Sequence, residues 1–271
     1  MEAARDLSRK VSLDTTAGSK KLALKAVYPR NIPPNHSHQM DLQITLPRNT
    51  SITLHKEDGN IQIRNLEGQI EIGTENGDIL CENVMADVRL VSEDGNVNIK
   101  KCRLTNLNIK KEDGNIHCDD ISGNCDISLE DGDVTISYDE TKAENCTCIV
   151  RGEDGNIKIS RGTFAKCQVD RESGTIDCDN VRGNLDLKLH EGQVVVDYAD
   201  NVPESCSINV QIEEGGVRLS APSKIFPADS PSTAKRIDKG AEWTTKAGTP
   251  GGGTRTVSLR VDEGSVKVEK R

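Results

Sequence analysis

The sequence predicts an all-β protein, a single parallel β-solenoid that is right-handed and β-helix-like, with about nine coils of 18–23 residues and end caps. Three observations predict this fold. An acidic turn motif with a glycine recurs along the chain, aliphatic residues alternate with polar residues on both sides of it, and only six of the 271 residues are aromatic. The scarcity of rings favours a narrow, repetitive core of Ile, Val and Leu.

The turn motif places acidic or polar residues before a glycine, as in Glu57-Asp58-Gly59-Asn60-Ile61. Successive glycines are 18, 18, 19, 18, 23, 19, 18 and 23 residues apart. Because glycine adopts the positive φ that a sharp corner needs, each motif predicts one corner of a coil. The predicted corners are Gly59, Gly77, Gly95, Gly114, Gly132, Gly155, Gly174, Gly192 and Gly215.

Each coil is expected to contain two strands. Apolar residues alternate after the glycine, as at Ile61 and Ile63, and again midway to the next glycine, as at Ile70 and Ile72. A unit of two strands cannot bury its own apolar face, so successive units are expected to stack. The near-constant spacing favours this stack over an antiparallel sandwich or a conventional barrel, whose loops vary in length.

A longer repeat lies over the short one. Residues 101–160 align with residues 161–220 without a gap and with 18 identities in 60. Both 23-residue steps fall at the same place in this unit, after Tyr138 and Tyr198. We therefore expect two loops that bulge from one edge of the coil, and these loops are the first candidates for specificity.

The chain divides into four predicted segments. Residues 1–20 are expected to be a disordered N-terminus, 21–54 N-terminal strands that cap the first coil, 55–220 the repeat solenoid, and 221–271 a C-terminal loop with capping strands. Within the caps we expect strands at 22–27, 40–46, 257–261 and 266–268, and an apolar lid of Ile225, Phe226 and Trp243.

Composition narrows the function classes. A net charge of -9 disfavours a nucleic-acid partner, which requires a basic face. No stretch approaches 18 consecutive apolar residues, so membrane insertion is not expected, and the start, residues 1–6, lacks the apolar core of a secretory signal. Nine cysteines form an odd set without a disulfide-framework spacing, which favours a reducing compartment. The sequence thus predicts an intracellular, soluble protein.

The cysteines are expected to be core residues. Cys81, Cys118 and Cys178 occupy the strand position that isoleucine holds in other coils, where a free thiol acts as a small hydrophobe. Cys146-x-Cys148 places two thiols on one face of a strand, but no second pair or nearby histidine completes a zinc site. No metal ligand is assigned.

The turn carboxylates allow two interpretations. Stacked aspartates repel one another unless they are screened or bridged, so a solvated acidic edge competes with calcium bridging. The row comprises Asp58, Asp94, Asp113, Asp131 and Asp154. A ladder of side-chain amides is expected beside it, from Asn60, Asn96, Asn115 and Asn156.

No enzyme signature is present. The sequence contains no Gly-x-Ser-x-Gly, Walker loop or His-Glu-x-x-His. The turn carboxylates are too uniform to separate an acid from a base, and few rings besides Tyr138 and Tyr198 could stack on a sugar. The histidines are scattered, and His36-Ser37-His38 falls in a proline-containing loop. We therefore expect no enzyme, and no catalytic residue, cofactor-binding residue or cofactor is assigned.

The serial Glu-Asp-Gly-Asn-Ile-x-Ile units, and the Gly-Asn-x-Asp-Ile/Leu-x-Leu units at 123–129 and 183–189, resemble the adhesin domain-of-unknown-function family. The resemblance covers about residues 42–270. It is closest to a group of animal proteins that share a terminal segment with a tryptophan, here Trp243, before a strand. It implies a parallel β-coil, a non-enzymatic adhesin-like role, and the mitochondrion as an alternative to the cytoplasm.

The predicted function is a rigid binding or scaffold surface for another macromolecule, with an unknown protein partner and an open oligomeric state. One alternative is a polysaccharide-active or carbohydrate-binding β-helix. A second alternative is a calcium-stabilised structural protein.

Overall fold

The computed structural model describes residues 12–18, 21–27, 44–142, 144–227, 235–237, 241–249 and 251–271. The chain divides into two compact units, Met1–Ile44 and Thr45–Arg271. Apart from one short 3-10 helix, η1 (Ser223–Ile225), the described elements are strands, which confirms the all-β class. No helix within these ranges is long and apolar enough to cross a membrane.

The first unit contains a β-hairpin. Strand β1 (Ser12–Gly18) pairs antiparallel with β2 (Lys21–Val27), which coincides with the strand predicted at 22–27. The segment expected to be disordered therefore contains a strand, because its backbone groups find partners in the strand that follows directly. Of the strand predicted at 40–46, residues 40–43 lie outside the described ranges. Residues 44–46 are not in a strand, and the proline that follows them has no N–H for a ladder.

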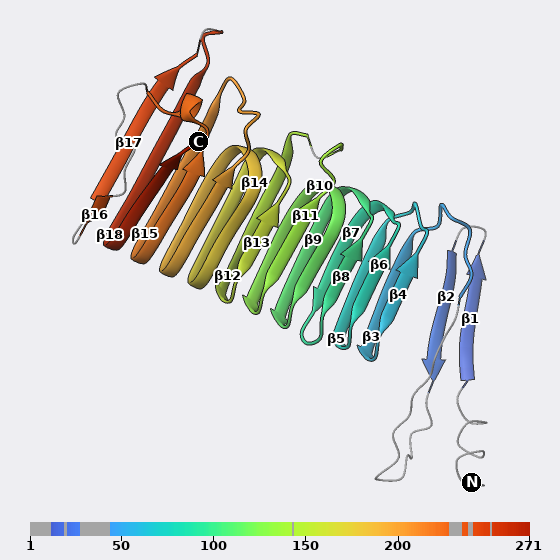
Figure 1. Cartoon of the computed structure of the whole chain (residues 1–271). Coiled ribbons are helices and arrows are strands. Elements are labelled where there is room, and N and C mark those ends of the chain that lie inside the picture. Colours follow the sequence, from blue (N-terminus) through green and yellow to red (C-terminus); the bar gives the residue numbers. More distant parts are fainter. Residues whose placement is uncertain are drawn as a thin grey trace. The chain divides into compact units, whose positions relative to one another are not determined.

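The second unit is a stack of coils, and each coil adds one strand to each of two parallel sheets (Figure 1). The first sheet contains β3 (Ile52–Asp58), β5 (Ile70–Asn76), β7 (Met85–Ser92), β9 (Arg103–Asp113) and β12 (Cys146–Asp154). The second sheet contains β4 (Ile61–Arg64), β6 (Ile79–Glu82), β8 (Val97–Lys100), β11 (Val134–Tyr138) and β13 (Ile157–Ser160). Four longer strands bend around an edge and contribute to both sheets: β10 (Ile116–Asp131), β14 (Thr163–Tyr198), β15 (Cys206–Ala221) and β18 (Thr254–Lys270). The predicted parallel β-solenoid is confirmed.

Equivalent residues of successive coils lie opposite one another. In the second sheet, Ile61 pairs with Ile79, which pairs with Val97. This register places residues of the same position in columns along the stack, one coil apart. Strand spacing in a sheet is about 4.8 Å, so columns of identical charge or identical chemistry become close neighbours.

The corner glycines form one such column. All nine predicted corners have positive φ, between 97° at Gly95 and 141° at Gly215. A Cβ on Gly155 would lie 2.2 Å from the carbonyl oxygen of Gly132 in the coil before, so close stacking as well as backbone conformation requires glycine. A tenth corner, Gly264 in β18, pairs opposite Gly215 and has a φ of 146°. We number the coils 1 to 10 by these glycines.

The core lies between the two sheets and consists of inward-facing aliphatic and cysteine side chains. In the second sheet Cys81 and Cys118 flank Ile99 in one column, and all three are 0% exposed. All nine cysteines are free and buried, as expected for small hydrophobes. The aromatic rings close the core beside the longer coils, where Tyr138 packs edge-on against Phe164 with 5.3 Å between ring centroids.

The last coil carries an antiparallel cap. Strands β16 (Lys235–Ile237) and β17 (Ala241–Gly248) both pair antiparallel with β18. Ile225 and Phe226 are buried, and the Phe226 ring lies 5.9 Å from that of Trp243, which packs against the core. The predicted apolar lid is present. The two capping strands expected at 257–261 and 266–268 are parts of β18, which pairs parallel with β15 as coil 10.

Candidate functional site

The edge at the corner glycines is acidic. The residue two positions before the glycine is acidic in every coil except one, where it is His190: Glu57, Glu75, Glu93, Glu112, Glu130, Glu153, Glu172, Glu213 and Asp262. The next column contains the residue directly before each corner glycine. Neutral residues at some of its positions separate the aspartates and donate hydrogen bonds to them. The Asn76 amide donates to Asp58 (2.9 Å), and the Ser173 hydroxyl donates to Asp154. These carboxylates form an acidic edge along the described coils.

The expected asparagine ladder follows the corner glycines but has a different chemistry. Each side-chain oxygen accepts a hydrogen bond from the backbone N–H of the next coil, as from Asp78 N to Asn60 Oδ1 (2.9 Å). The four expected asparagines all take part, but aspartates occupy two further positions, Asp78 and Asp133. The bonds, 2.8 to 3.2 Å long, join Asn60, Asp78, Asn96, Asn115, Asp133, Asn156 and Thr175. The reason is that a parallel stack presents a backbone donor one coil away, and either side chain offers an acceptor oxygen.

Two buried cations lie beneath the acidic edge, each three residues before a corner glycine and 60 residues apart in sequence. Lys111 is 4% exposed, and its ammonium donates to the carbonyl oxygen of Glu93 (3.1 Å). Arg171 is 3% exposed, and its guanidinium donates to the carbonyl oxygens of Leu129 (2.9 Å), Gly132 (2.9 Å) and Asp154. Both cations therefore place positive charge inside the coil, near the stacked acids.

Burial lowers the pKa of Lys111 and of Arg171, while nearby aspartates oppose that shift. For Lys111 the first of these is Asp94, and for Arg171 it is Asp154. The calcium alternative rested on repulsion in the acidic column, and these internal cations relieve part of that repulsion. Within the described ranges no three His, Cys, Asp or Glu side chains are grouped to hold a metal ion.

The thiols are deep in the core. Cys125, Cys148 and Cys167 lie opposite one another in successive coils of the first sheet, each 0 or 1% exposed. Burial raises the pKa of Cys81 to about 12 and raises that of Cys118 further. Because the thiolate is the nucleophile and the metal ligand, Cys81 and Cys118 are unsuited to either role in the folded state.

The histidines do not converge. His55, His117 and His190 are all exposed on different coils, and His190 Nδ1 lies 2.7 Å from Glu213. The pair His36 and His38 lies outside the described residues. The two tyrosines proposed as sugar platforms are 0% exposed, and the Tyr198 hydroxyl both donates to the Gly183 carbonyl (2.9 Å) and accepts from the Gly183 N–H (2.6 Å).

The opposite edge, where the second sheet returns to the first, is the turn edge. Six polar residues at this edge hold positive φ six positions after a corner glycine: Asn65, Asn83, Lys101, Asp120, Arg161 and Asn180. Both 23-residue coils depart from this pattern and insert their extra residues here, after the buried Tyr138 and Tyr198 (Figure 1). The two insertions therefore leave the stack at the same edge, as predicted.

A hollow of about 290 Å³ lies on the turn edge beside the first insertion. Its floor is a grid of two columns from coils 2, 3 and 4. One column is Asn83, Lys101 and Asp120, and the other is Met85, Arg103 and Ser122, which pair in register. We call this hollow the turn-edge groove.

The walls of the turn-edge groove come from the two sides of the floor. Arg48, from the segment before β3, lines it and pairs with Glu67 (2.8 Å). The first insertion supplies Asp139 and Lys142, which form an ion pair. The hydrogen bonds from Lys142, and secondarily from Thr141, hold the pKa of the Asp139 carboxyl at about 2.

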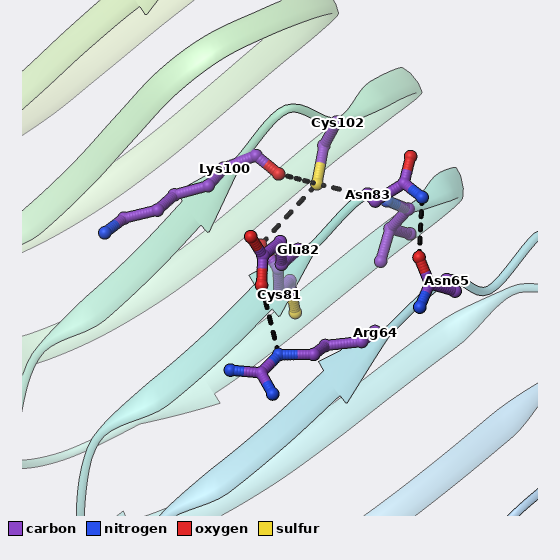
Figure 2. Close-up of polar contacts among 8 residues, drawn as sticks. Arg64, Asn65, Cys81, Glu82, Asn83, Lys100 and Cys102 are labelled. Atoms are coloured by element: carbon purple, nitrogen blue, oxygen red, sulfur yellow. Dashed lines mark hydrogen bonds and ion pairs between the residues drawn. The ribbon is translucent and has the colours of Figure 1, made fainter.

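Cys102 lies under this floor, and Figure 2 shows why it is structural. Its sulfur accepts from the backbone N–H of Val84 (3.4 Å) and lies 3.1 Å from the carbonyl oxygen of Lys100. The side chain is 1% exposed, and burial raises its pKa. The thiol thus ties the turns of coils 2 and 3 together, while its neighbours Lys101 and Arg103 face outward.

A second hollow, of about 350 Å³, lies on the second sheet around Val195. Its cations are already paired. Lys158 lies 3.4 Å from Asp177, and Arg218 lies 3.2 Å from Glu269. The turn-edge groove differs because the side chains of Lys101 and Arg103 have no hydrogen-bond or ion-pair partner among the described residues. Sequence reasoning pointed to the insertions but missed this floor, whose only signal is the recurring polar residue six positions after the glycine.

These features define a repeat protein of stacked parallel β-coils with an acidic corner edge and a turn edge that carries a groove. The chain belongs to the Toastrack DUF4097 family, which matches residues 6–149 and 140–269. The resemblance to a family of unknown function with a β-coil fold is thereby confirmed at that level. A search of curated proteins and a search of solved structures gave no match.

Proposed function

We propose that this protein is a non-enzymatic binding scaffold that holds a partner protein against its turn edge. One observation carries the proposal. The first insertion and Arg48 flank a hollow whose floor presents two cations, Lys101 and Arg103, without an ion pair among the described residues, in a chain with a net charge of -9. The coils beneath are fixed by ladder bonds and close packing, so the floor is a pre-organised surface.

The finer predictions remain part of this proposal. They are the adhesin-like role, the intracellular location in cytoplasm or mitochondrion, and the closer kinship with the animal proteins called family with sequence similarity 185 member A. The alternating core and the corner column support a rigid rather than a catalytic role, since the tyrosines and thiols that chemistry would use are buried. Burial of Tyr138 and Tyr198 also weakens the polysaccharide alternative, which needs exposed rings.

The test exploits the internal repeat. Residues 139–145 and 199–205 are loops of seven residues at equivalent positions, so the first can be replaced by the sequence of the second without altering coil length. Proximity labelling in cells, with fractionation, would compare this loop-exchanged protein with the parent and with a Lys158→Gln control on the second sheet.

We expect a partner protein that is labelled by the parent and the control but lost with the exchanged loop, while the thermal melt is unchanged. Labelling that does not depend on the loop contradicts the proposal. Enrichment of glycan-processing neighbours without such a partner would favour the carbohydrate alternative instead.

A further inference from the structure

The turn-edge groove has a charge opposite to that of the chain. The protein has a net charge of -9, yet the groove is lined by four cations and two acids: Arg48, Lys101, Arg103, Lys142, Asp120 and Asp139. This excess of positive charge lies in a concave site, which concentrates its electrostatic field.

Not all of this charge is available to a ligand. Glu67 holds Arg48, and Asp139 holds Lys142, so those two pairs are close to neutral. Lys101 and Arg103 remain, on either side of the inward-facing Cys102, and both side chains are exposed. Asp120, which follows Lys101 in its column, contributes a negative charge that opposes these two cations.

The neighbours of these two cations are neutral donors and an apolar surface. Along its column, Arg103 has Ser122 on one side and Met85 on the other, and Met85 is 40% exposed. Lys101 has Asn83 beside it in coil 2. A planar guanidinium, an ammonium, a hydroxyl and an amide about one strand spacing apart suit an anionic oxygen group, and Met85 suits an apolar stem attached to it.

We propose that the turn-edge groove binds an anionic side chain of a partner protein, a carboxylate or a phosphoryl group, between Lys101 and Arg103. This inference rests on the proposed scaffold function for its partner. The volume of about 290 Å³ lies at the lower limit for small-molecule sites, which fits one anionic group presented by a larger molecule.

The experiment titrates the isotope-labelled full-length protein with inorganic phosphate and with two short peptides, one containing phosphoserine and one containing aspartate at the same position. Backbone amide shifts are followed by NMR. We expect saturable shifts at residues 83–85, 101–103 and 120–122, with at least one peptide binding more tightly than inorganic phosphate because its stem contacts Met85. The tighter peptide identifies the source of the anion.

Three variants test the charges. Lys101→Gln with Arg103→Gln should weaken peptide binding about tenfold, since charged hydrogen bonds are lost. Lys110→Gln with Lys166→Gln removes the same charge from the exposed face of the first sheet and should weaken it less than about twofold. Asp120→Asn should tighten binding about threefold, because a like charge leaves the site.

Equal weakening by both double variants, or no tightening by Asp120→Asn, overturns the assignment. Inorganic phosphate binding at least as tightly as both peptides overturns the choice of a partner side chain. The two proposals fail separately. If the groove binds the peptide but labelling does not depend on the loop, the scaffold proposal fails. If labelling depends on the loop but Lys101→Gln with Arg103→Gln leaves peptide binding unchanged, the anion assignment fails.

Discussion

Arg171 provides the most demanding test of the architecture. Its guanidinium donates to carbonyl oxygens of Leu129 and Gly132 in coil 5 and of Asp154 in coil 6, although Arg171 itself belongs to coil 7. Arg171→Leu removes these charge-assisted bonds, leaves the acceptors unpaired and exposes the aspartates to mutual repulsion. Each such bond contributes about 1.5–3 kcal/mol, and the recovered hydration of the guanidinium offsets part of the sum. We expect a loss of about 3–5 kcal/mol in the free energy of unfolding.

Two lysines provide the comparison. Lys111, the equivalent buried cation, reaches only the Glu93 carbonyl and, at 3.4 Å, the Ser92 hydroxyl, so Lys111→Met should cost about 1–2 kcal/mol. Its neighbour Lys110 points outward, and Lys110→Met should stay within about 0.5 kcal/mol. Urea unfolding followed by far-ultraviolet circular dichroism measures all three, with equal m-values as the check on cooperativity. A cost below about 1 kcal/mol at Arg171, or equal costs at the buried and outward positions, refutes the reasoning.

Gly152 extends the same test. A Cβ at this position would lie 1.7 Å from the carbonyl oxygen of Leu129 and 2.0 Å from Nη1 of Arg171, so Gly152→Ala must displace the guanidinium. Because the two residues share one space, their substitutions should not add. We expect a coupling of about 1 kcal/mol or more in a double-mutant cycle.

The remaining predictions concern the core, the corners, the first insertion and the thiols. Ile157→Ala should cost about 2–5 kcal/mol in urea unfolding, whereas exposed Lys158→Ala should cost less than about 1 kcal/mol; equal losses would reverse the inward assignment. Gly155→Val should destabilise because its φ is 123°, and a neutral result would contradict the corner geometry. The carboxyl resonance of Asp139 should titrate with a midpoint at about pH 2, and Lys142→Gln should raise this midpoint. Because the pKa of Asp139 is lowered in the folded state, its ionised form stabilises the fold at pH values above the ordinary aspartate pKa. This contribution is lost as the pH falls through about 2. The native thiols should resist alkylation until unfolding, and rapid labelling of several cysteines would contradict their burial.

Local sequence rules predicted most of the fold because each coil repeats the same short-range requirements. Glycine at the corner and alternation in the strands appear at nearly constant spacing, so corners 1 to 9 followed from periodicity. Corner 10 has the same signature, Glu263-Gly264-Ser265-Val266, but it lies 49 residues after Gly215, and a search by fixed period passes over it.

The candidate site was less predictable because it depends on which residues meet across coils. Lys101, Arg103 and Asp120 belong to no motif, and their proximity follows only from the register of three coils and the position of the first insertion. The burial of Lys111 and Arg171 was not predicted, because charged side chains ordinarily face water. Their inward orientation could nevertheless be predicted from the sequence. Lys111 and Arg171 both lie three residues before a corner glycine, a position that the strand alternation places on the inward face.

The long connection between β15 and β18 affects where this protein can accept inserted segments. Strands β15 and β18 pair in unbroken register from Cys206 opposite Arg255 to Ala221 opposite Lys270, although more than thirty residues separate the end of one from the start of the other. The entropy of closing a loop grows only with the logarithm of its length, so doubling this connection costs about 0.6 kcal/mol. The connection is therefore a natural insertion point, where whole segments can be gained or exchanged while the layers on either side keep their alignment.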